Sequence, residues 1–366
     1  MHEFLPVATN ILTPALVHPG GSTCQQVSPL DAADWNAKLP TGLSASFFHS
    51  VAWARVLHDT YGFKPLYFTL GNRQGFHSLL PMMEANSWLT GKRGLSLPFT
   101  DECEPLCADS DSFHQLFQAA LDCAKARGWK YVECRGGKSL FGDDTTASTS
   151  FYGHRLDLRH DEPALWRRVH DSTRRAVRKA EQSGLTVEFS QDLAAVRIFH
   201  GLLCQTRKRH GVPPQPFRFF QNIHRHALAT NQGQVLLIHI GRKPVAGAIF
   251  FHFGKTAIFK FGASDDSFHK LRVNNLVIWQ AIKWHVQQGF SMLDFGRTSL
   301  GNEGLRRFKL SWGTEERLID YVRYNRRTDS FVRVRDRSSG WHNHVIKMLP
   351  DCSTRLIGTA LYKHIA

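Results

Sequence analysis

Residues 289–313 read GFSMLDFGRTSLGNEGLRRFKLSWG, and this stretch decides which fold and which kind of site the chain is expected to have. It begins as an apolar strand ending at Asp294, breaks at glycines into a polar loop, and closes on a basic segment with Phe308 and Trp312. Glycine backbone at a strand end lets a substrate approach closely, and functional residues concentrate in such loops. The stretch therefore predicts a binding or catalytic site, although a solvated basic turn packed on two aromatic rings has the same pattern.

A second copy of this pattern lies in the first half of the chain. Residues 128–133 read GWKYVE and residues 289–294 read GFSMLD. Each run follows a segment with the pattern of a helix, 112–127 capped by Asp111 and about 275–288. Apolar runs separated by turn residues precede both helices and indicate antiparallel strands. The sequence thus predicts a duplicated α/β domain, and the alternative is chance similarity between two α/β segments.

The composition bounds the size and the partners of the protein. A chain of 366 residues that is 42% hydrophobic is long enough for two ordinary domains. The net charge of +15 favours a polyanionic partner such as nucleic acid, a nucleotide-linked substrate or an acidic membrane surface, and the alternative is a basic but unspecialised enzyme. The expected organisation is a flexible leader at 1–25, an N-terminal domain at 26–150, a C-terminal domain at 151–330, and a helical extension at 331–366.

Cysteine usage and hydropathy indicate a cytoplasmic protein. The seven cysteines form no Cys-x-x-Cys pair, which favours reduced thiols, and no third ligand stands near the histidine pairs, so no metal site is predicted. The first 21 residues lack the basic start and unbroken apolar core of a signal peptide. No stretch reaches the roughly 18 apolar residues that a membrane span needs. We expect a soluble protein, with the inner face of the membrane as an alternative location.

The segment between the two halves is strongly basic. Residues 161–183 have the pattern of one amphipathic helix, which presents either an anion-binding or a plainly solvated face. Its cations are Arg167, Arg168, Arg174, Arg175, Arg178 and Lys179. A second helix, roughly 193–209, ends in the run TRKRHG, and the prolines that follow stiffen the loop at 212–216. This arrangement of cations beside a stiff loop suits substrate binding.

Several short motifs together resemble the FemAB-like proteins. They are residues 174–184 (RRAVRKAEQSG), 206–213 (TRKRHGVP), 262–264 (GAS), 274–276 (NNL), 294–297 (DFGR) and 308–313 (FKLSWG). The resemblance is close over residues 151–324 and looser over 47–135. These proteins have tandem GNAT (acyl-CoA N-acyltransferase type) domains, the second often labelled a BioF2-like acetyltransferase domain. The resemblance therefore implies an α/β fold with mixed sheets, in two tandem GNAT-like domains.

The resemblance also implies an acyltransferase, either an aminoacyltransferase or an N-acetyltransferase. The best-known relatives move an amino acid from aminoacyl-tRNA to the side-chain amine of a cell-wall precursor, whereas other GNAT proteins use coenzyme A. Coenzyme A-using domains usually carry a glycine-rich loop whose N–H groups hold the pyrophosphate at a helix N-terminus. Residues 268–276 (FHKLRVNNL) contain no glycine, which favours aminoacyl-tRNA as the donor. The donor is expected as a co-substrate, without a permanently bound cofactor.

The candidate site residues follow from this resemblance and from the chemistry of amine attack on an ester or thioester. Lys309 matches the family's lysine and is expected to stabilise developing negative charge or the donor's terminal ribose. Asp294 or Glu303 would take the proton of the amine, and the sequence leaves this choice open. The residues expected to bind substrate are Arg297, Asn302, Arg306, Arg307, Arg207, Arg209 and His210. Those expected to bind the donor are Arg175, Arg178, Lys270, Arg272, Asn274 and Asn275.

Two further functions compete with aminoacyl transfer to a cell-envelope precursor, whether a peptidoglycan peptide or a polysaccharide amino sugar. One is an acyl-CoA-dependent N-acetyltransferase in exopolysaccharide biosynthesis. The other is a nucleic-acid-binding module without catalysis, which the net charge supports, although no stable DNA complex is expected. The triplet Asp294-Phe295-Gly296 also occurs in protein kinases, but the glycine-rich loop and the His-Arg-Asp triplet of that class are missing.

Overall fold

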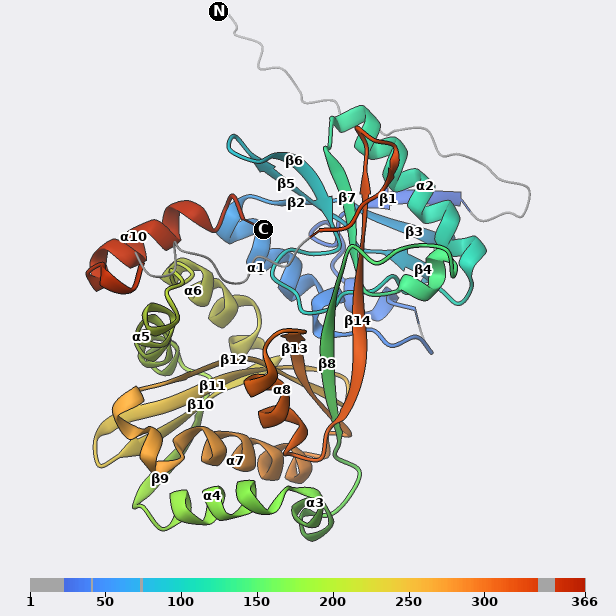
Figure 1. Ribbon diagram of the computed structural model, residues 1–366. Helices are drawn as coiled ribbons and strands as arrows, with labels where there is room; N and C mark the ends of the chain where they lie inside the picture. Colours follow the sequence, from blue (N-terminus) through green and yellow to red (C-terminus); the bar gives the residue numbers. More distant parts are fainter. Residues whose placement is uncertain (1–22, 41, 73–74, 335–345, 366) are drawn as a thin grey trace, which may run out of the picture.

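One mixed sheet runs through both halves of the molecule (Figure 1). The computed structural model describes residues 23–40, 42–72, 75–334 and 346–365. The strand order in this 12-stranded sheet is β2-β5-β6-β7-β14-β8-β13-β12-β11-β10-β9, with β15 paired to β14. The strands are β2 (Lys64–Pro65), β5 (Met83–Ser87), β6 (Gly91–Leu95), β7 (Tyr131–Arg135), β8 (Thr149–Asp157), β9 (Leu185–Ser190), β10 (Gly233–Ile240), β11 (Lys243–Phe253), β12 (Thr256–Ser264), β13 (Met292–Ser299), β14 (Glu315–Asn325) and β15 (Ser330–Phe331).

The first module, residues 26–150, adds a small second sheet. This sheet has the order β1 (Thr23–Val27), β3 (Tyr67–Asn72) and β4 (Gly75–Leu80), and α2 (Ser110–Arg127) packs on it. Strand β1 begins inside the segment predicted as leader, because it pairs along its whole length with β3. The cap of α2 is Asp109, whose carboxylate accepts from Ser112 N, so the helix begins before the predicted cap Asp111.

The repeat predicted from residues 128–133 and 289–294 is present in the structure. Gly128 ends α2, and Gly289 follows α7 (Val273–Gln287), both with left-handed backbone (φ 70° and 72°). The next strand then runs parallel to an earlier one, with the register Leu95↔Glu133 in the first module and Ile258↔Asp294 in the second. Each parallel pair stops at these residues, so both modules contain two strands that separate just after a carboxylate.

The C-terminal strand ties the modules together. β14 comes from the second module, residues 151–330, yet it lies between β7 of the first module and β8. Its register with β7 places Arg323 opposite Glu133. The second module therefore completes the sheet of the first, which the sequence pattern did not indicate because β8 and β14 carry no repeat signal.

Helices cover both faces of the second module's sheet (Figure 1). One face packs on α7 and on the basic segment between the modules. That segment forms two helices, α3 (Glu162–Arg168) and α4 (Asp171–Glu181), and not the single helix predicted over 161–183. The break occurs because Val169 is buried in the core and the side chain of His170 accepts from Ser172 N to cap α4.

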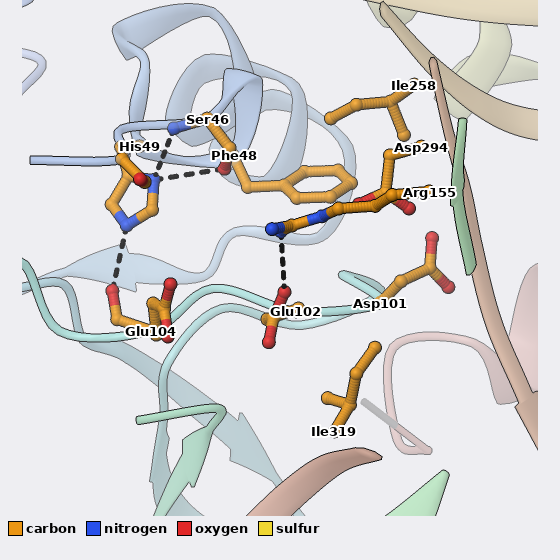
Figure 2. Close-up of a pocket in the computed structure, with 11 residues that line it drawn as sticks. Ser46, Phe48, His49, Asp101, Glu102, Glu104, Arg155, Ile258, Asp294 and Ile319 are labelled. Atoms are coloured by element: carbon orange, nitrogen blue, oxygen red, sulfur yellow. Dashed lines mark hydrogen bonds and ion pairs between the residues drawn. The ribbon is translucent and has the colours of Figure 1, made fainter. Parts of the chain in front are cut away.

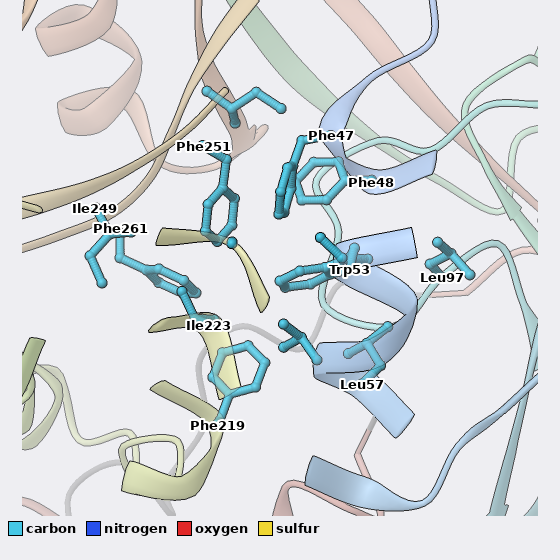
Figure 3. Packing of buried hydrophobic residues seen from close by; sticks show 14 of the residues in the cluster. Phe47, Phe48, Trp53, Leu57, Leu97, Phe219, Ile223, Ile249, Phe251 and Phe261 are labelled. Atoms are coloured by element: carbon cyan, nitrogen blue, oxygen red, sulfur yellow. The ribbon is translucent and has the colours of Figure 1, made fainter. Parts of the chain in front are cut away.

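The opposite face of the second module's sheet forms the contact between the modules. It packs on α5 (Leu193–His210), α5 packs on α6 (Phe217–His226), and α6 packs on α1 (Val51–Tyr61) of the first module. Figure 3 shows the aromatic core there, in which Phe47 stacks on Phe251 with ring centroids 4.2 Å apart. Burial of such large rings dominates the energetics of an interface, so this core fixes the two modules as one unit.

The remaining elements lie near the site or at the C-terminal end. A 3-10 helix η5 (Asp266–Leu271) precedes α7, and α8 (Glu303–Leu310) follows β13. In the predicted C-terminal extension, α10 (Asp351–Leu361) packs on α5. Within the described residues, no helix has the length and hydrophobicity needed to cross a membrane.

Candidate active site

The site forms where β12 and β13 separate. β12 contains a bulge, because Phe250 pairs with Phe259 and Ile249 with Phe261, which leaves Lys260 as the extra residue. β13 also contains a bulge, since Phe295 and Gly296 together lie opposite His154 of β8. Gly296 has φ 66°, and a Cβ atom there would lie 3.0 Å from the Asp101 carboxylate. Both bulges widen the separation and turn side chains into it.

Lys309 holds the β13 bulge in place. Its ammonium donates to the carbonyl oxygens of Gly296 (2.9 Å) and Arg297 (3.0 Å), and the residue is 3% exposed. Burial lowers its pKa to about 8, against the opposing effect of Asp101 and Asp294. The residue therefore positions the strand from inside the protein, and it is not among the residues lining the cavities described below.

A groove on the side of α7 and α8 consists of three adjoining hollows. The outer hollow, about 590 Å³, is lined by Arg175, Lys179, Arg272 and Arg307. A middle hollow of about 190 Å³ lies at the N-terminus of α7, and the inner one has a volume of about 460 Å³. Phe308 lines all three, so they adjoin one another from the basic surface to β12.

The inner hollow is apolar in its walls and cationic at one end. Phe259, Phe261 and Ile278 are among the apolar residues that line it, and Arg207 and Arg209 reach it from the last turn of α5. No aspartate or glutamate lines any of the three hollows within the part of the chain that the structure describes. The groove as a whole therefore suits an anionic ligand with an apolar inner part.

A second, much smaller pocket of about 40 Å³ is lined largely by the first module and has the opposite charge (Figure 2). The loop after β6 supplies Asp101, Glu102 and Glu104, and the second module supplies Asp294 and Arg155. The loop has left-handed backbone at Leu97 and Phe99 (φ 59° and 60°). Such a conformation costs about 1 kcal/mol or more per non-glycine residue, and strained backbone is often found at functional sites.

Ion pairs neutralise most of the carboxylates in this pocket. Arg155 Nε lies 3.0 Å from Asp294 Oδ2, and its Nη2 lies 3.3 Å from Glu102 Oε2. Glu102 also accepts from both terminal nitrogens of Arg317. Figure 2 shows Arg155 between Asp294 and Glu102. These pairs fix the walls of the pocket and leave one carboxylate to consider.

Glu104 is the carboxylate without such a partner. It is partly buried, and no hydrogen bond or ion pair of its carboxylate is found within the described residues. Burial, together with the neighbouring Glu102 charge, raises the pKa of Glu104 above its usual value of 4.5. A carboxylate with a raised pKa that faces a pocket has the properties of a general base.

A buried ion pair separates the groove from the acidic pocket. Lys260 Nζ, at the β12 bulge, lies 2.9 Å from Asp101 Oδ2. Lys260 lines the inner hollow and Asp101 lines the acidic pocket. Burial lowers the pKa of Lys260, and the paired Asp101 opposes that shift. A ligand in either cavity would therefore meet one member of the same pair.

The structure brings together part of the set of residues predicted from the sequence. Those that line the groove are Arg175, Arg272, Asn274, Asn275, Arg207, Arg209, His210 and Arg307. Asp294 lines the acidic pocket. This split assigns the predicted cations and carboxamides to one cavity and the predicted carboxylate to the other.

The other predicted residues have structural partners instead. Glu303 and Glu316 both bind Arg306, and Asn302 caps α8 by accepting from Leu305 N. Arg297 donates to the hydroxyl of Tyr321, and Arg178 lies over the ring of Trp166. Lys270 belongs to η5 and is exposed. The predicted residues Glu303, Asn302, Arg306, Arg297, Arg178 and Lys270 are therefore not among those lining the groove or the acidic pocket.

The sequence reasoning missed Asp101, Glu102, Glu104, Arg155 and Lys260. One signal for the first three was available, because residues 101–104 read DECE, three carboxylates in four positions of a strongly basic chain. Arg155 and Lys260 carried no such signal, since each lies inside an ordinary strand pattern and only the fold brings it to the site.

Comparison with known proteins identifies the fold. Residues 167–310 match the family model described as an acetyltransferase (GNAT) domain. No curated protein sequence matches the chain. Among solved structures, FemX is similar with a TM-score of 0.64 at 14% identity, over 82% of this chain and 97% of that one.

Two further solved structures have a similar fold. A tandem GNAT protein from the clavulanic acid biosynthesis pathway has a TM-score of 0.52 at 9% identity, covering 82% of this chain and 98% of that one. L-PGS from Bacillus licheniformis has a TM-score of 0.50 at 15% identity, covering 83% of this chain and 90% of that one. The chain therefore has the fold of tandem GNAT proteins, and its residues 167–310 match the acetyltransferase (GNAT) domain.

Proposed function

We propose that the protein transfers an aminoacyl or acyl group from an anionic donor in the groove to an amine held in the acidic pocket. The observation that carries this proposal is the separation of charge at the point where β12 and β13 diverge. The groove is lined by cations without a carboxylate, whereas the adjoining pocket is lined by four carboxylates and one arginine. Such a division matches a negatively charged donor and a positively charged acceptor.

The proposed reaction uses three groups of the site. Glu104 takes a proton from the acceptor ammonium, and the neutral amine attacks the donor's carbonyl carbon. Lys260, which faces the inner hollow, stabilises the oxyanion that forms. The new C–N amide bond remains as the ester or thioester bond breaks, and the leaving alcohol or thiol departs with a proton. Lys309 acts indirectly, by keeping the β13 bulge open.

The donor we favour is aminoacyl-tRNA. Helix α4 lines the outer hollow. Further exposed cations lie beside it, namely Arg167 and Arg168 on α3 and Arg178 on α4. A surface of this kind fits a long polyanion better than a single nucleotide. The absence of glycine in residues 266–276 removes the close backbone cradle that a pyrophosphate uses. Acyl-CoA is the second candidate, because an apolar inner hollow beside a helix N-terminus also suits a thioester.

The acceptor we favour is an amine of a cell-envelope precursor, either a peptide side chain or an amino sugar. The resemblance to FemAB-like proteins and the fold shared with FemX and L-PGS support this class. An exopolysaccharide amino sugar modified from acyl-CoA is the alternative. A membrane-linked precursor would also place the protein beside an anionic surface, which its net charge of +15 would favour.

Titration of the donor tests the proposal. Calorimetry with acetyl-CoA, and in parallel with uncharged and aminoacylated tRNA, should give saturable binding of one donor class. Radiolabelled transfer from that donor to a diamine or amino-sugar acceptor should then require Glu104. Salt-sensitive binding to any nucleic acid, without transfer from either donor, would instead support a binding module without catalysis.

A further inference from the structure

Within the part of the chain that the structure describes, the inner hollow contains a cation that has no carboxylate partner. Arg207 lies in the last turn of α5, is partly buried, and lines the hollow beside apolar walls. Its charge acts on the neighbouring Tyr362 and His210, and no hydrogen bond, ion pair or ring contact of its guanidinium is found within the described residues. A partly buried cation in apolar surroundings is costly unless it is paired, so this position is suited to an anionic ligand.

The neighbouring cations of the hollow are already paired. Lys260 binds Asp101, and Arg209 lies 3.3 Å from Asp266. The electrostatic potential at His210 is positive. Burial lowers the pKa of His210, and the positive charges of Arg209, Arg207 and Lys347 lower it further. The end of the hollow at α5 is therefore positive in net terms, and Arg207 is the group that supplies the excess charge.

Two simpler explanations account for less of this arrangement. A cation in the last turn stabilises the C-terminus of a helix, but Lys208 and Arg209 already supply that charge in α5. Donor phosphates could also pair with Arg207, but the outer hollow has four cations of its own. Phe308 is the one residue that lines both the outer and the inner hollow, and Arg207 lines the inner one. Donor phosphates bound in the outer hollow would therefore lie away from Arg207.

We infer that the transferred acyl group carries a carboxylate, which binds Arg207 at the α5 end of the inner hollow. The inference rests on the proposed function and narrows its donor to dicarboxylic acyl groups, as a coenzyme A thioester or as an acidic aminoacyl ester. The carboxylate is a spectator in the reaction, since the amide forms and the ester or thioester breaks at the other end of the acyl group. Arg207 then determines specificity and is not a catalytic residue.

Matched donors test this inference on the full chain. Succinyl-CoA is compared with butyryl-CoA, and glutamyl-tRNA with glutaminyl-tRNA, for transfer to one acceptor by the unmodified protein, Arg207→Gln and Arg207→Lys. Lys208→Gln is the control, because it removes a charge from the same helix turn without lining the hollow. Loss of a charge-assisted hydrogen bond should lower kcat/KM for the carboxylate-bearing donor about 10- to 100-fold.

The expected outcome is selective. Arg207→Gln should lose activity with the carboxylate-bearing donor, and its kcat/KM for the matched neutral donor should stay within about 3-fold of that of the unmodified protein. Arg207→Lys should have intermediate activity with the carboxylate-bearing donor. Lys208→Gln should behave as the unmodified protein. An equal loss with both donors of a pair would assign Arg207 to the donor phosphates and overturn the inference. Transfer from the unmodified protein without preference for the carboxylate would also overturn it, whereas no transfer from any donor would contradict the proposed function itself.

Discussion

The carboxylates at which the two modules' parallel strands separate have opposite surroundings. Glu133 of the first module is 3% exposed and bound by Arg135 and by Arg323 of β14. Asp294 of the second module has a side chain that is 18% exposed and lines the acidic pocket. In the first module, β14 therefore fills the position beside the carboxylate. In the second module, the corresponding position beside Asp294 remains open to a pocket.

The loops that follow the matching strands differ in the same sense. In the second module, the loop between β12 and α7 contributes to the walls of the groove. In the first module, the corresponding loop between β6 and α2 turns toward the partner module and presents Asp101, Glu102 and Glu104. The first module has therefore become part of the second module's site, as the source of its acidic wall.

The largest expected effect separates catalysis from folding. Glu104→Gln removes the proposed base, so kcat should fall about 100- to 10,000-fold, the range of general base catalysis. Steady-state kinetics with the donor that binds would measure this, with Glu315→Gln on exposed β14 backbone as the control variant. A Glu104→Gln protein with normal kcat would remove the first module from the chemistry.

The corresponding change at Glu133 of the first module should have the reverse effect. Glu133→Gln leaves Arg135 and Arg323 without their buried carboxylate, so the free energy of unfolding should fall by about 3 kcal/mol. Urea denaturation measures this loss. Turnover per folded molecule should stay near normal. A selective loss of kcat with unchanged stability would show that Glu133 acts in the reaction and not in holding β14 to the first module.

The pH dependence should differ in sign between the two carboxylates. Burial, followed by the charge of Glu102, raises the pKa of Glu104 in the folded protein. Ionised Glu104 therefore lowers the free energy of unfolding, and this loss grows as the pH rises from the pKa of the unfolded state to that of the folded state. Glu104→Gln should therefore be slightly more stable than the unmodified protein at pH 8. Activity should fall about tenfold per pH unit below the Glu104 pKa. Thermal unfolding and pH–rate profiles check both, and a less stable variant at pH 8 would contradict this sign.

For Glu133 the sign is opposite. Although burial acts to raise its pKa, Arg135 and Arg323 lower it overall. The stability from this carboxylate is therefore present above the unfolded pKa and is lost as pH falls through the folded pKa. The stability difference between the unmodified protein and Glu133→Gln should shrink on acidification, and a difference that grows instead would rule out the ion pairs as its source.

The smallest expected effect concerns the outer groove. Arg307→Gln removes one exposed cation from the outer hollow, so the donor Kd should rise only about 2- to 5-fold at low salt, and less at high salt. Arg327→Gln, an exposed arginine beside the first module's sheet, serves as the control and should leave Kd unchanged. Equal effects of the two variants would mean that net charge, and not the groove, attracts the donor.

The sequence was sufficient to predict the repeat and therefore the tandem fold. The helix, glycine and strand at 128–133 and 289–294 are local patterns, and local patterns survive in the structure as α2–β7 and α7–β13. The interlocking by β14 could not be predicted in this way, because which strand fills a gap depends on tertiary pairing and not on periodicity.

The candidate site was predictable mainly on its cationic side, with Asp294 as the one predicted carboxylate that lines the acidic pocket. The groove arginines belong to basic motifs that are visible in the sequence, such as residues 174–184 and 206–213. Lys309 illustrates the limit, because the motif indicates a lysine without indicating that its ammonium is buried on two carbonyl groups. Glu104 lies in the other module, more than 150 residues from β12, and only the docking of the modules brings it to the site.

Hydrogen exchange of the protein with bound donor product measures directly whether the donor binds at the second module. Coenzyme A and deacylated tRNA would be used in separate experiments, each followed by mass spectrometry of backbone amides. The account predicts protection of residues 266–276 and 303–311 around the groove, with little change in residues 96–113 of the first module. Protection confined to residues 96–113, with none at the N-terminus of α7, would contradict the assignment of the donor to the second module.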